Sequence, residues 1–186
     1  FLFQMQALMN IQLLNSYNIK RFVTTCPHDY NTIKNEYKSL GGVYEVFHHT
    51  EFLIQLINNN KLKLNKIYKD AIITYHDPCY LGRGNRIYNE PRLLLNNVGF
   101  KINEMNRSKN KSFCCGAGGA QMFKEPEKGN QDINIKRSEE AIKTKANIVA
   151  VSCPFCNTMM NDGMTSKQES VDVVDIAQMI EKAEDL

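Results

Sequence analysis

The 186 residues have the composition of an ordinary folded protein, with 42% hydrophobic and 23% charged side chains. The net charge is only +3, and asparagines dilute the basic residues between Lys101 and Lys111, so the charge pattern argues against nucleic-acid binding. Glutamines interrupt the first apolar run and no basic leader precedes it. We therefore expect neither a signal peptide nor a membrane span there, which favours a cytoplasmic location.

The chain opens with a predicted helix over residues 2–16, because Leu2, Met5, Met9 and Leu13 recur at helical spacing. Such a stripe is typical of a helix that faces a core. The chain has no initiator methionine and starts inside this helix, which suggests a fragment of a longer protein.

Apolar runs rich in β-formers then alternate with helical stretches. Strands are expected at residues 21–25, 43–47, 71–75, 100–104, 148–152 and 171–174. Helices are expected at residues 30–38, 51–59, 89–97, 132–146 and 176–184, with caps at Thr50, Asp132 and Asp175, and a further helix is expected after Cys156. This alternation predicts an α/β fold of two related βα lobes with small, mostly parallel sheets.

The two lobes are suggested by an internal repeat. Residues 23–32 align with residues 151–158 if one insertion is allowed, and both read as a strand, a Cys-Pro turn and a helix. Residues 44–57 align in the same way with residues 171–180. Two homologous lobes are the economical explanation.

Five of the six cysteines form one ordered set, which consists of Cys79, Cys114, Cys115, Cys153 and Cys156. The gaps between its members are 34 residues (80 to 113) and 37 residues (116 to 152), so three distant segments must converge. In a reducing compartment such a set indicates metal binding or redox work more than disulfides. A redox dithiol at Cys153 and Cys156 is an alternative that leaves the other three cysteines unexplained.

Each cysteine segment has features that suit a sulfur site. Cys79 follows a strand, at the end of the sheet where α/β folds build sites, and Gly82 and Gly84 allow a tight loop after it. The glycine-rich run 116–119 lets backbone amides approach anionic sulfur, but it lacks the pattern of a dinucleotide-binding loop. The Cys153–Cys156 turn precedes a helix, whose N-terminus lowers thiol pKa values.

Three motifs together resemble a known family. They are His76-Asp-Pro-Cys-Tyr-Leu-Gly-Arg83, Cys114-Cys-Gly-Ala-Gly-Gly119 and Cys153-Pro-Phe-Cys156. They are similar to the CCG, or cysteine-rich, domain of heterodisulfide reductase catalytic subunits and of iron-sulfur oxidoreductases associated with electron-transfer flavoprotein. The resemblance implies a complete second copy over residues 71–186 and the C-terminal part of an altered first copy over residues 1–70.

The resemblance also implies a cofactor and a role. It predicts a non-cubane 4Fe-4S cluster that carries electrons or reduces a disulfide-like substrate, held by Cys79, Cys114, Cys115, Cys153 and Cys156. It implies a redox partner, either a flavoprotein linked to a quinone-side protein or another iron-sulfur subunit, and peripheral attachment at the inner face of a membrane. The alternative is a zinc-stabilised interaction or assembly module without catalysis, in which one thiolate exceeds the four that zinc needs.

Two further groups of residues are weaker candidates. Cys26 and Asp29 stand where the family's first copy has Cys-Pro-x-Cys, so Asp29 is either an oxygen ligand or a solvated capping carboxylate. The redox site is accordingly expected within residues 71–186. His76 and Asp77 are candidate catalytic residues, either for hydrogen bonding and proton delivery at the site or for orienting the loop.

The remaining basic side chains have competing interpretations. His48 and His49 end a predicted strand, and a surface or capping role is favoured there over metal ligation. Arg83 and Arg86 are either attractors of an anionic substrate or partner, or solvated loop charges.

Overall fold

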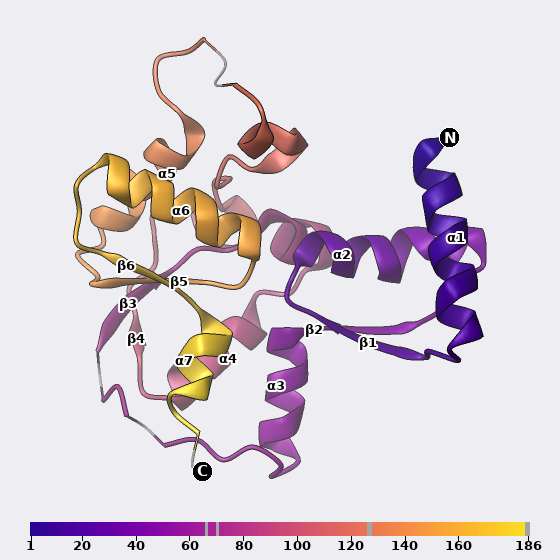
Figure 1. Cartoon of the computed structure of the whole chain (residues 1–186). Helices are drawn as coiled ribbons and strands as arrows, with labels where there is room; N and C mark the ends of the chain where they lie inside the picture. Colours follow the sequence, from indigo (N-terminus) through magenta and orange to yellow (C-terminus); the bar gives the residue numbers. More distant parts are fainter. Residues whose placement is uncertain (66, 70, 126–127, 185–186) are drawn as a thin grey trace.

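The computed structural model describes residues 1–65, 67–69, 71–125 and 128–184 as a mixture of helices and two parallel sheets (Figure 1). The smaller sheet pairs β1 (Arg21–Thr24) with β2 (Glu45–His48). The larger sheet has the order β4-β3-β5-β6, built from β3 (Ile72–Tyr75), β4 (Lys101–Ile102), β5 (Ile148–Val151) and β6 (Asp172–Asp175). All of its pairs are parallel, which confirms the predicted α/β class.

Seven α-helices connect or cover these strands in the described residues. They are α1 (Leu2–Ser16), α2 (Pro27–Asn31), α3 (His49–Asn58), α4 (Asn89–Asn97), α5 (Ile133–Ile142), α6 (Pro154–Ser166) and α7 (Ile176–Glu181). Short π-helical turns follow α2 at Thr32–Glu36 and follow Cys79 at Tyr80–Gly84 (η3). Single 3-10 turns lie at Tyr37–Leu40, Lys109–Lys111 and Gly118–Phe123.

The larger sheet is buried on both faces. Helices α4 and α7 pack on one face and helices α5 and α6 on the other (Figure 1). Alternation along β5 explains the two cores, since Ala150 contacts the α4 and α7 side while Val149 and Val151 contact the α5 and α6 side. Burial of these apolar residues stabilises the sheet by removing apolar surface from water.

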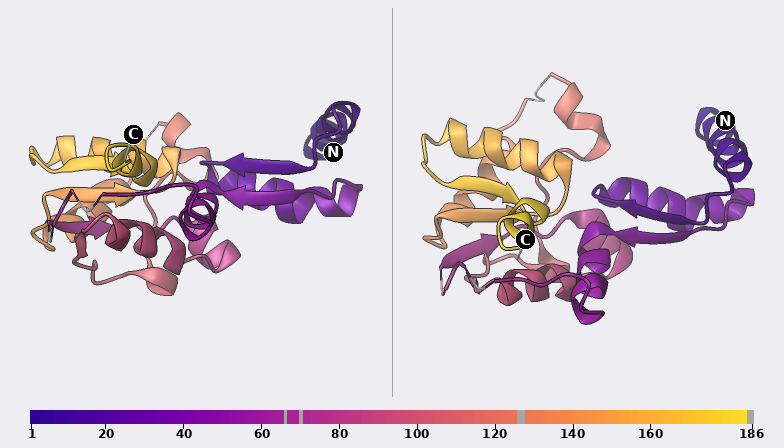
Figure 2. Two further views of the ribbon diagram at one scale, coloured as in Figure 1. Left: turned by 90° about the horizontal axis from the view of Figure 1, so that it is seen from below. Right: turned by 60° about the horizontal axis from the view of Figure 1, so that its bottom comes forward.

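The smaller sheet projects away from the larger one and ends at α1 (Figure 2). Its inner face packs on α2 and on the η3 turn, through Tyr30, Val46 and Leu81. Helix α3 runs from β2 back to the larger sheet, where it packs against α4 and α7. The first third of the chain is therefore joined to the rest at the carboxyl ends of both sheets.

The two segments of the predicted repeat share one strand register. Thr24 pairs with His48 in the smaller sheet, and Val151 pairs with Asp175 in the larger one. His48 and Asp175 then close capping boxes at the starts of α3 and α7. This agreement supports the repeat, while the lobe boundary at residue 70 falls outside the described residues and stays a prediction.

Several predicted boundaries differ from the structure. The helix expected at 30–38 begins at Pro27, because proline suits a first helical turn, and continues as a π-helical turn. The strand expected at 100–104 is only Lys101–Ile102. The cap of α3 is His48 and not Thr50, and Asp132 precedes α5 without a side-chain capping bond in the described structure.

The expectation that the apolar stripe of α1 faces a core is wrong. Leu2, Met5, Met9 and Leu13 are all largely exposed. The helix instead packs through the side chains of Ala7 and Ile11. The helical prediction for residues 2–16 is nevertheless confirmed. Among the described residues, no helix has both the length and the apolar character needed to cross a membrane.

Candidate metal centre

The five cysteines of the ordered set lie together at the carboxyl end of the larger sheet. Cys79 follows β3 and starts η3, Cys114 and Cys115 lie in the loop before the Gly118 turn, Cys153 is the N-cap of α6 and Cys156 lies in its first turn. Their side chains form a continuous series of sulfur contacts in the order Cys79, Cys114, Cys115, Cys156, Cys153. The predicted convergence of three distant segments is therefore present.

The cysteine thiols hydrogen-bond to one another, and each thiolate opposes ionisation of its neighbours. Hydrogen bonds from Cys115 and Cys79 lower the pKa of Cys114, and a hydrogen bond from Cys156 lowers the pKa of Cys153 to about 5. The same contact with Cys114 raises the pKa of Cys115 to about 12. A bound cation would replace the protons of the cysteine thiols, since the thiolate is the form that ligates metals.

Backbone amides of the glycine-rich loop point at two of the sulfurs. Gly116 N–H donates to Cys114 Sγ over 3.3 Å, the amide of Gly118 also donates to that sulfur, and the amide of Ala117 donates to Cys115. Gly116 has φ +98°, and a Cβ there would lie 3.2 Å from the side chain of Ile133. Only glycine fits this turn without strain, as the sequence predicts.

The loop after Cys79 needs only one of its two glycines. A Cβ on Gly82 would lie 2.6 Å from the ring of Tyr88, whereas the nearest atom to a Cβ on Gly84 is 3.7 Å away. The tight loop predicted after Cys79 therefore requires glycine at position 82 and not at position 84.

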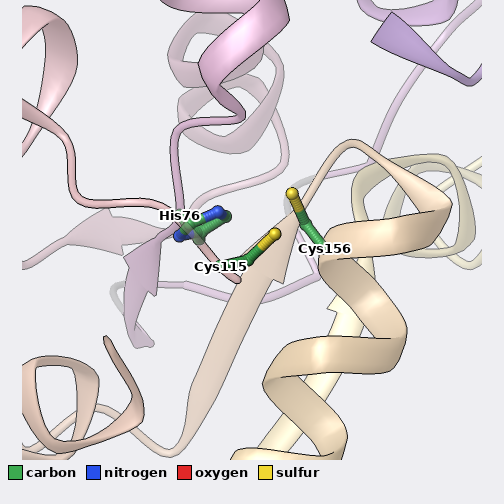
Figure 3. A group of neighbouring side chains, drawn as sticks. All are labelled: His76, Cys115 and Cys156. Atoms are coloured by element: carbon green, nitrogen blue, oxygen red, sulfur yellow. The ribbon is translucent and has the colours of Figure 1, made fainter. Parts of the chain in front are cut away.

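His76 lies directly beside the cysteines. One of its ring nitrogens and the sulfurs of Cys115 and Cys156 lie within 4.8 Å of one another, and all three residues are buried (Figure 3). Its Nδ1 accepts a hydrogen bond of 3.0 Å from Arg137 Nε. Burial, aided by the Arg137 charge, lowers the pKa of His76 to about 3, so the imidazole is neutral.

Asp77 is engaged elsewhere. Its two carboxylate oxygens accept hydrogen bonds of 2.8 and 2.9 Å from the guanidinium of Arg92, and Oδ2 also accepts one from the backbone amide of Lys109. Its backbone carbonyl accepts from Ser112 Oγ. These contacts tie the Cys79 loop to the Cys114 loop and favour the loop-orienting role for Asp77 over a catalytic one.

Residues from the first third of the chain also border the centre. His28, in α2, hydrogen-bonds with Cys153, and its Nδ1 lies 3.6 Å from Cys26 Sγ. These contacts, that with Cys153 first, raise the pKa of His28 to about 10. The redox site expected within residues 71–186 is therefore bordered by the first third of the chain, and the sequence signal for His28 was its place in the same Cys-Pro motif as Cys26. Asp29 is exposed in the first turn of α2, whose N-cap is Cys26, and this favours a solvated carboxylate over an oxygen ligand.

His48 is fully buried, so the expected surface position is wrong while the capping role is confirmed. Its Nδ1 lies 2.7 Å from Thr50 Oγ1, and its Nε2 donates over 3.1 Å to the backbone carbonyl of Ser152. Ser152 precedes Cys153 and is held from the other side by Tyr75, whose hydroxyl lies 2.7 Å from Ser152 Oγ. The end of β2 therefore helps to position Cys153, which follows β5 and caps α6.

His49 is buried as well, and within the described part of the chain neither of its ring nitrogens has a hydrogen-bond partner. Its neighbours are the His48 ring, at 4.3 Å between centroids, and Asp175, whose Oδ1 is 3.5 Å from His49 Nε2. Burial lowers the pKa of His49 to about 4 and raises the pKa of Asp175 to about 6. Asp175 is thus largely protonated over the range in which His49 would charge.

We expect His49 to make the fold acid-sensitive. His49 takes up a proton near pH 6.5 in the unfolded chain but only near pH 4 in the folded chain. The contribution of neutral His49 to folding stability is therefore complete above pH 6.5 and is lost as the pH falls towards 4. The loss attributable to His49 is at most about 3 kcal/mol. Urea unfolding of the wild type and of His49→Phe should agree within about 1 kcal/mol at pH 7.5 and diverge at pH 4.5, with the variant the more stable. Parallel loss in both proteins would contradict the prediction.

The arginines after Cys79 differ in their surroundings. Both arginines are exposed, but Arg83 also donates a hydrogen bond to the backbone carbonyl of Ser112, which braces the Cys114 loop. On the other side of the loop a cavity of about 430 Å³ opens against Gly116, and it is lined in part by Met122, Lys124 and Met159. Nothing in the sequence indicated this cavity, because its walls come from separate segments.

Comparison with known proteins agrees with this geometry. Residues 73–161 match the cysteine-rich domain family CCG, and they contain the five converging cysteines and His76. This match places residues 73–161 in the CCG cysteine-rich domain family. The matched residues cover the larger sheet from β3 to β5 together with most of α6.

Longer proteins are similar to this CCG chain over nearly its whole length. It is 38% identical to EtfAB:quinone oxidoreductase of Syntrophomonas wolfei, covering 98% of the chain and 27% of that protein. It is 41% identical to the Bacillus subtilis protein named "Probable iron-sulfur-binding oxidoreductase FadF", covering 97% and 26%. It is 34% identical to a subunit of the dihydromethanophenazine:CoB–CoM heterodisulfide reductase of Methanosarcina barkeri, covering 94% and 43%. The chain therefore spans less than half of each relative.

Proposed function

We propose that the chain is part of an iron-sulfur oxidoreductase, in which Cys79, Cys114, Cys115, Cys153 and Cys156 hold a 4Fe-4S cluster of the non-cubane type. The observation that carries this proposal is the continuous contact of five sulfurs from three segments at one sheet edge. Tetrahedral zinc needs four thiolates and leaves one surplus. The relatives named as iron-sulfur and quinone oxidoreductases support the same class.

The donor set fits such a cluster chemically. Iron in clusters prefers thiolate ligands, and hydrogen bonds to sulfur tune the reduction potential. The loop amides of Gly116, Ala117 and Gly118 already donate to two sulfurs. An iron-sulfur cluster supplies electron transfer when bound. The chain's own part is to hold the sulfurs, to exclude water from Cys115, Cys153 and Cys156, and to donate hydrogen bonds to them.

The proposal extends to partners and to the organisation of the whole protein. Residues 71–186 form a complete second CCG copy and residues 1–70 the end of an altered first copy, whose His28 borders the second copy's site. The names of the relatives support electron transfer with a flavoprotein and a quinone-side partner, with reduction of a disulfide as the related activity. Such a protein would work in the cytoplasm, attached peripherally to a membrane complex.

Metal analysis of the anaerobically purified chain tests the proposal. We expect a brown protein with about four iron and four sulfide per chain. An electron paramagnetic resonance signal should appear or disappear on reduction, because the cluster changes its electron count. A colourless protein that binds one zinc and no sulfide would overturn the proposal in favour of a zinc-stabilised module.

A further inference from the structure

A buried arginine reaches the metal centre through His76. Arg137 lies on α5 and is completely buried, and its Nε donates to His76 Nδ1 over 3.0 Å. Its Nη1 donates to Glu140 over 2.6 Å and to the backbone carbonyl of Arg107 over 2.8 Å. Three hydrogen bonds thus fix the guanidinium against the imidazole.

The direction of the Arg137–His76 hydrogen bond is unambiguous. A guanidinium carries only donors, so Nδ1 of His76 must supply the lone pair and carry no proton. A neutral imidazole has one ring proton, which therefore sits on Nε2. The position of Arg137 Nε beside His76 Nδ1 therefore selects the tautomer of His76 that carries its proton on Nε2.

This tautomer is the opposite of the one that a metal-binding histidine needs. A ligating histidine offers a lone pair to the metal and usually donates its other N–H to a carboxylate or a carbonyl. In His76 the lone pair on Nδ1 is used by Arg137, and the other nitrogen holds the proton. His76 is nevertheless close to Cys115 and Cys156, with the three candidate ligand atoms within 4.8 Å of one another (Figure 3).

We propose that His76 is a hydrogen-bond donor to the sulfur of this centre and not a metal ligand, and that Arg137 is the positioning residue that keeps the proton on Nε2. This inference rests on the proposed function, because the sulfur in question belongs to the proposed metal centre. A donated N–H draws electron density from sulfur and stabilises the more reduced cluster, which raises the reduction potential. Glu140, which also pairs with Arg107, places a carboxylate beside the buried guanidinium of Arg137.

Pulsed electron paramagnetic resonance of the iron-loaded chain, labelled with ¹⁵N-histidine, tests the role of His76. We expect only a weak nitrogen coupling and an exchangeable proton coupling that disappears in D₂O. A strong ¹⁵N coupling, typical of a nitrogen bound to iron, would overturn the inference. A wild-type chain that binds no iron would overturn the proposed function but would not test the tautomer of His76.

Long-range ¹H–¹⁵N nuclear magnetic resonance of the metal-free chain measures that tautomer directly. A proton found on Nδ1 of His76 would overturn the inference.

A pair of variants on α5 tests the role of Arg137. Arg137→Met should keep most of the bound iron but lower the reduction potential and weaken the exchangeable proton coupling. Lys136→Met removes a charge from the neighbouring, half-exposed position and should change neither. An unchanged potential in Arg137→Met would overturn the positioning role. If that variant does not fold, Arg137→Lys retains a cationic donor, and it must show the wild-type Nε2–H tautomer for the inference to stand.

Discussion

The Cys115→Ser chain is expected to retain at most about one tenth of the iron bound by the wild type. Cys115 lies in the middle of the series of sulfurs, in contact with both Cys114 and Cys156. Loss of a neighbour that only supports a ligand typically costs 10- to 100-fold in metal affinity, and loss of a ligand should cost no less. Iron and sulfide content per folded chain, after anaerobic reconstitution, measures the effect.

Cys26→Ser is the matched control for this experiment. Cys26 is also a buried cysteine after a parallel strand, but its sulfur contacts His28 and lies outside the series of five. This variant should keep at least about half of the wild-type iron, since only a hydrogen-bonding neighbour of His28 is altered. Equal iron loss in both variants would mean that the cluster is not held by the proposed set. If Cys115→Ser and the wild type each retained one zinc per chain, that result would support a four-thiolate zinc site.

Arg92→Met should destabilise the fold by about 3–5 kcal/mol, because it leaves the buried carboxylate of Asp77 without its counter-charge. Asp77 is 2% exposed and Arg92 9% exposed, and their two hydrogen bonds join the Cys79 loop to α4. Arg92 also binds Glu104, next to β4. Urea unfolding followed by circular dichroism, with equal metal loading of all proteins, measures the loss.

Arg21→Met serves as the control for that loss. The ion pair of Arg21 with Glu45 joins the two strands of the smaller sheet, but both side chains are largely exposed. Exposed pairs contribute about 0–1 kcal/mol, because water screens them. A loss in Arg92→Met no larger than that in Arg21→Met would show that the Asp77–Arg92 pair does not hold the Cys79 loop to α4.

The contacts of His28 and His48 connect the first third of the chain to the Cys153 segment of the metal centre. His48 donates to the carbonyl before Cys153, and His28 hydrogen-bonds with Cys153 itself. His48 is the last residue of β2, and His28 lies in α2, which follows β1. Both therefore lie near the carboxyl ends of the strands of the smaller sheet, where parallel α/β sheets place functional groups. Residues from the first third of the chain therefore help to shape the site, although Asp29 stands where the family resemblance predicts a cysteine ligand.

The amino-acid sequence was sufficient for the features that depend on local rules. Alternating apolar runs predicted the α/β class, and the spacing of five cysteines together with their glycines and prolines predicted that three segments meet. The repeat was visible because each Cys-Pro turn follows a strand, and Asp175 was found as a cap because capping is decided within one turn. Helix α4 was also predicted to the residue.

Contacts between distant segments were decided only by the tertiary structure. Apolar spacing placed Leu2 and Met9 on one face of α1 but could not tell whether a neighbour covers that face, and the structure leaves both exposed. Arg137 is an ordinary helix residue in the sequence, yet packing of α5 over the larger sheet buries it against His76. Burial and hydrogen-bond direction belong to the folded arrangement, so they alone settle which nitrogen of His76 carries the proton. The sequence identified the cysteines that are candidate ligands, and the fold determined which residues surround their sulfur atoms.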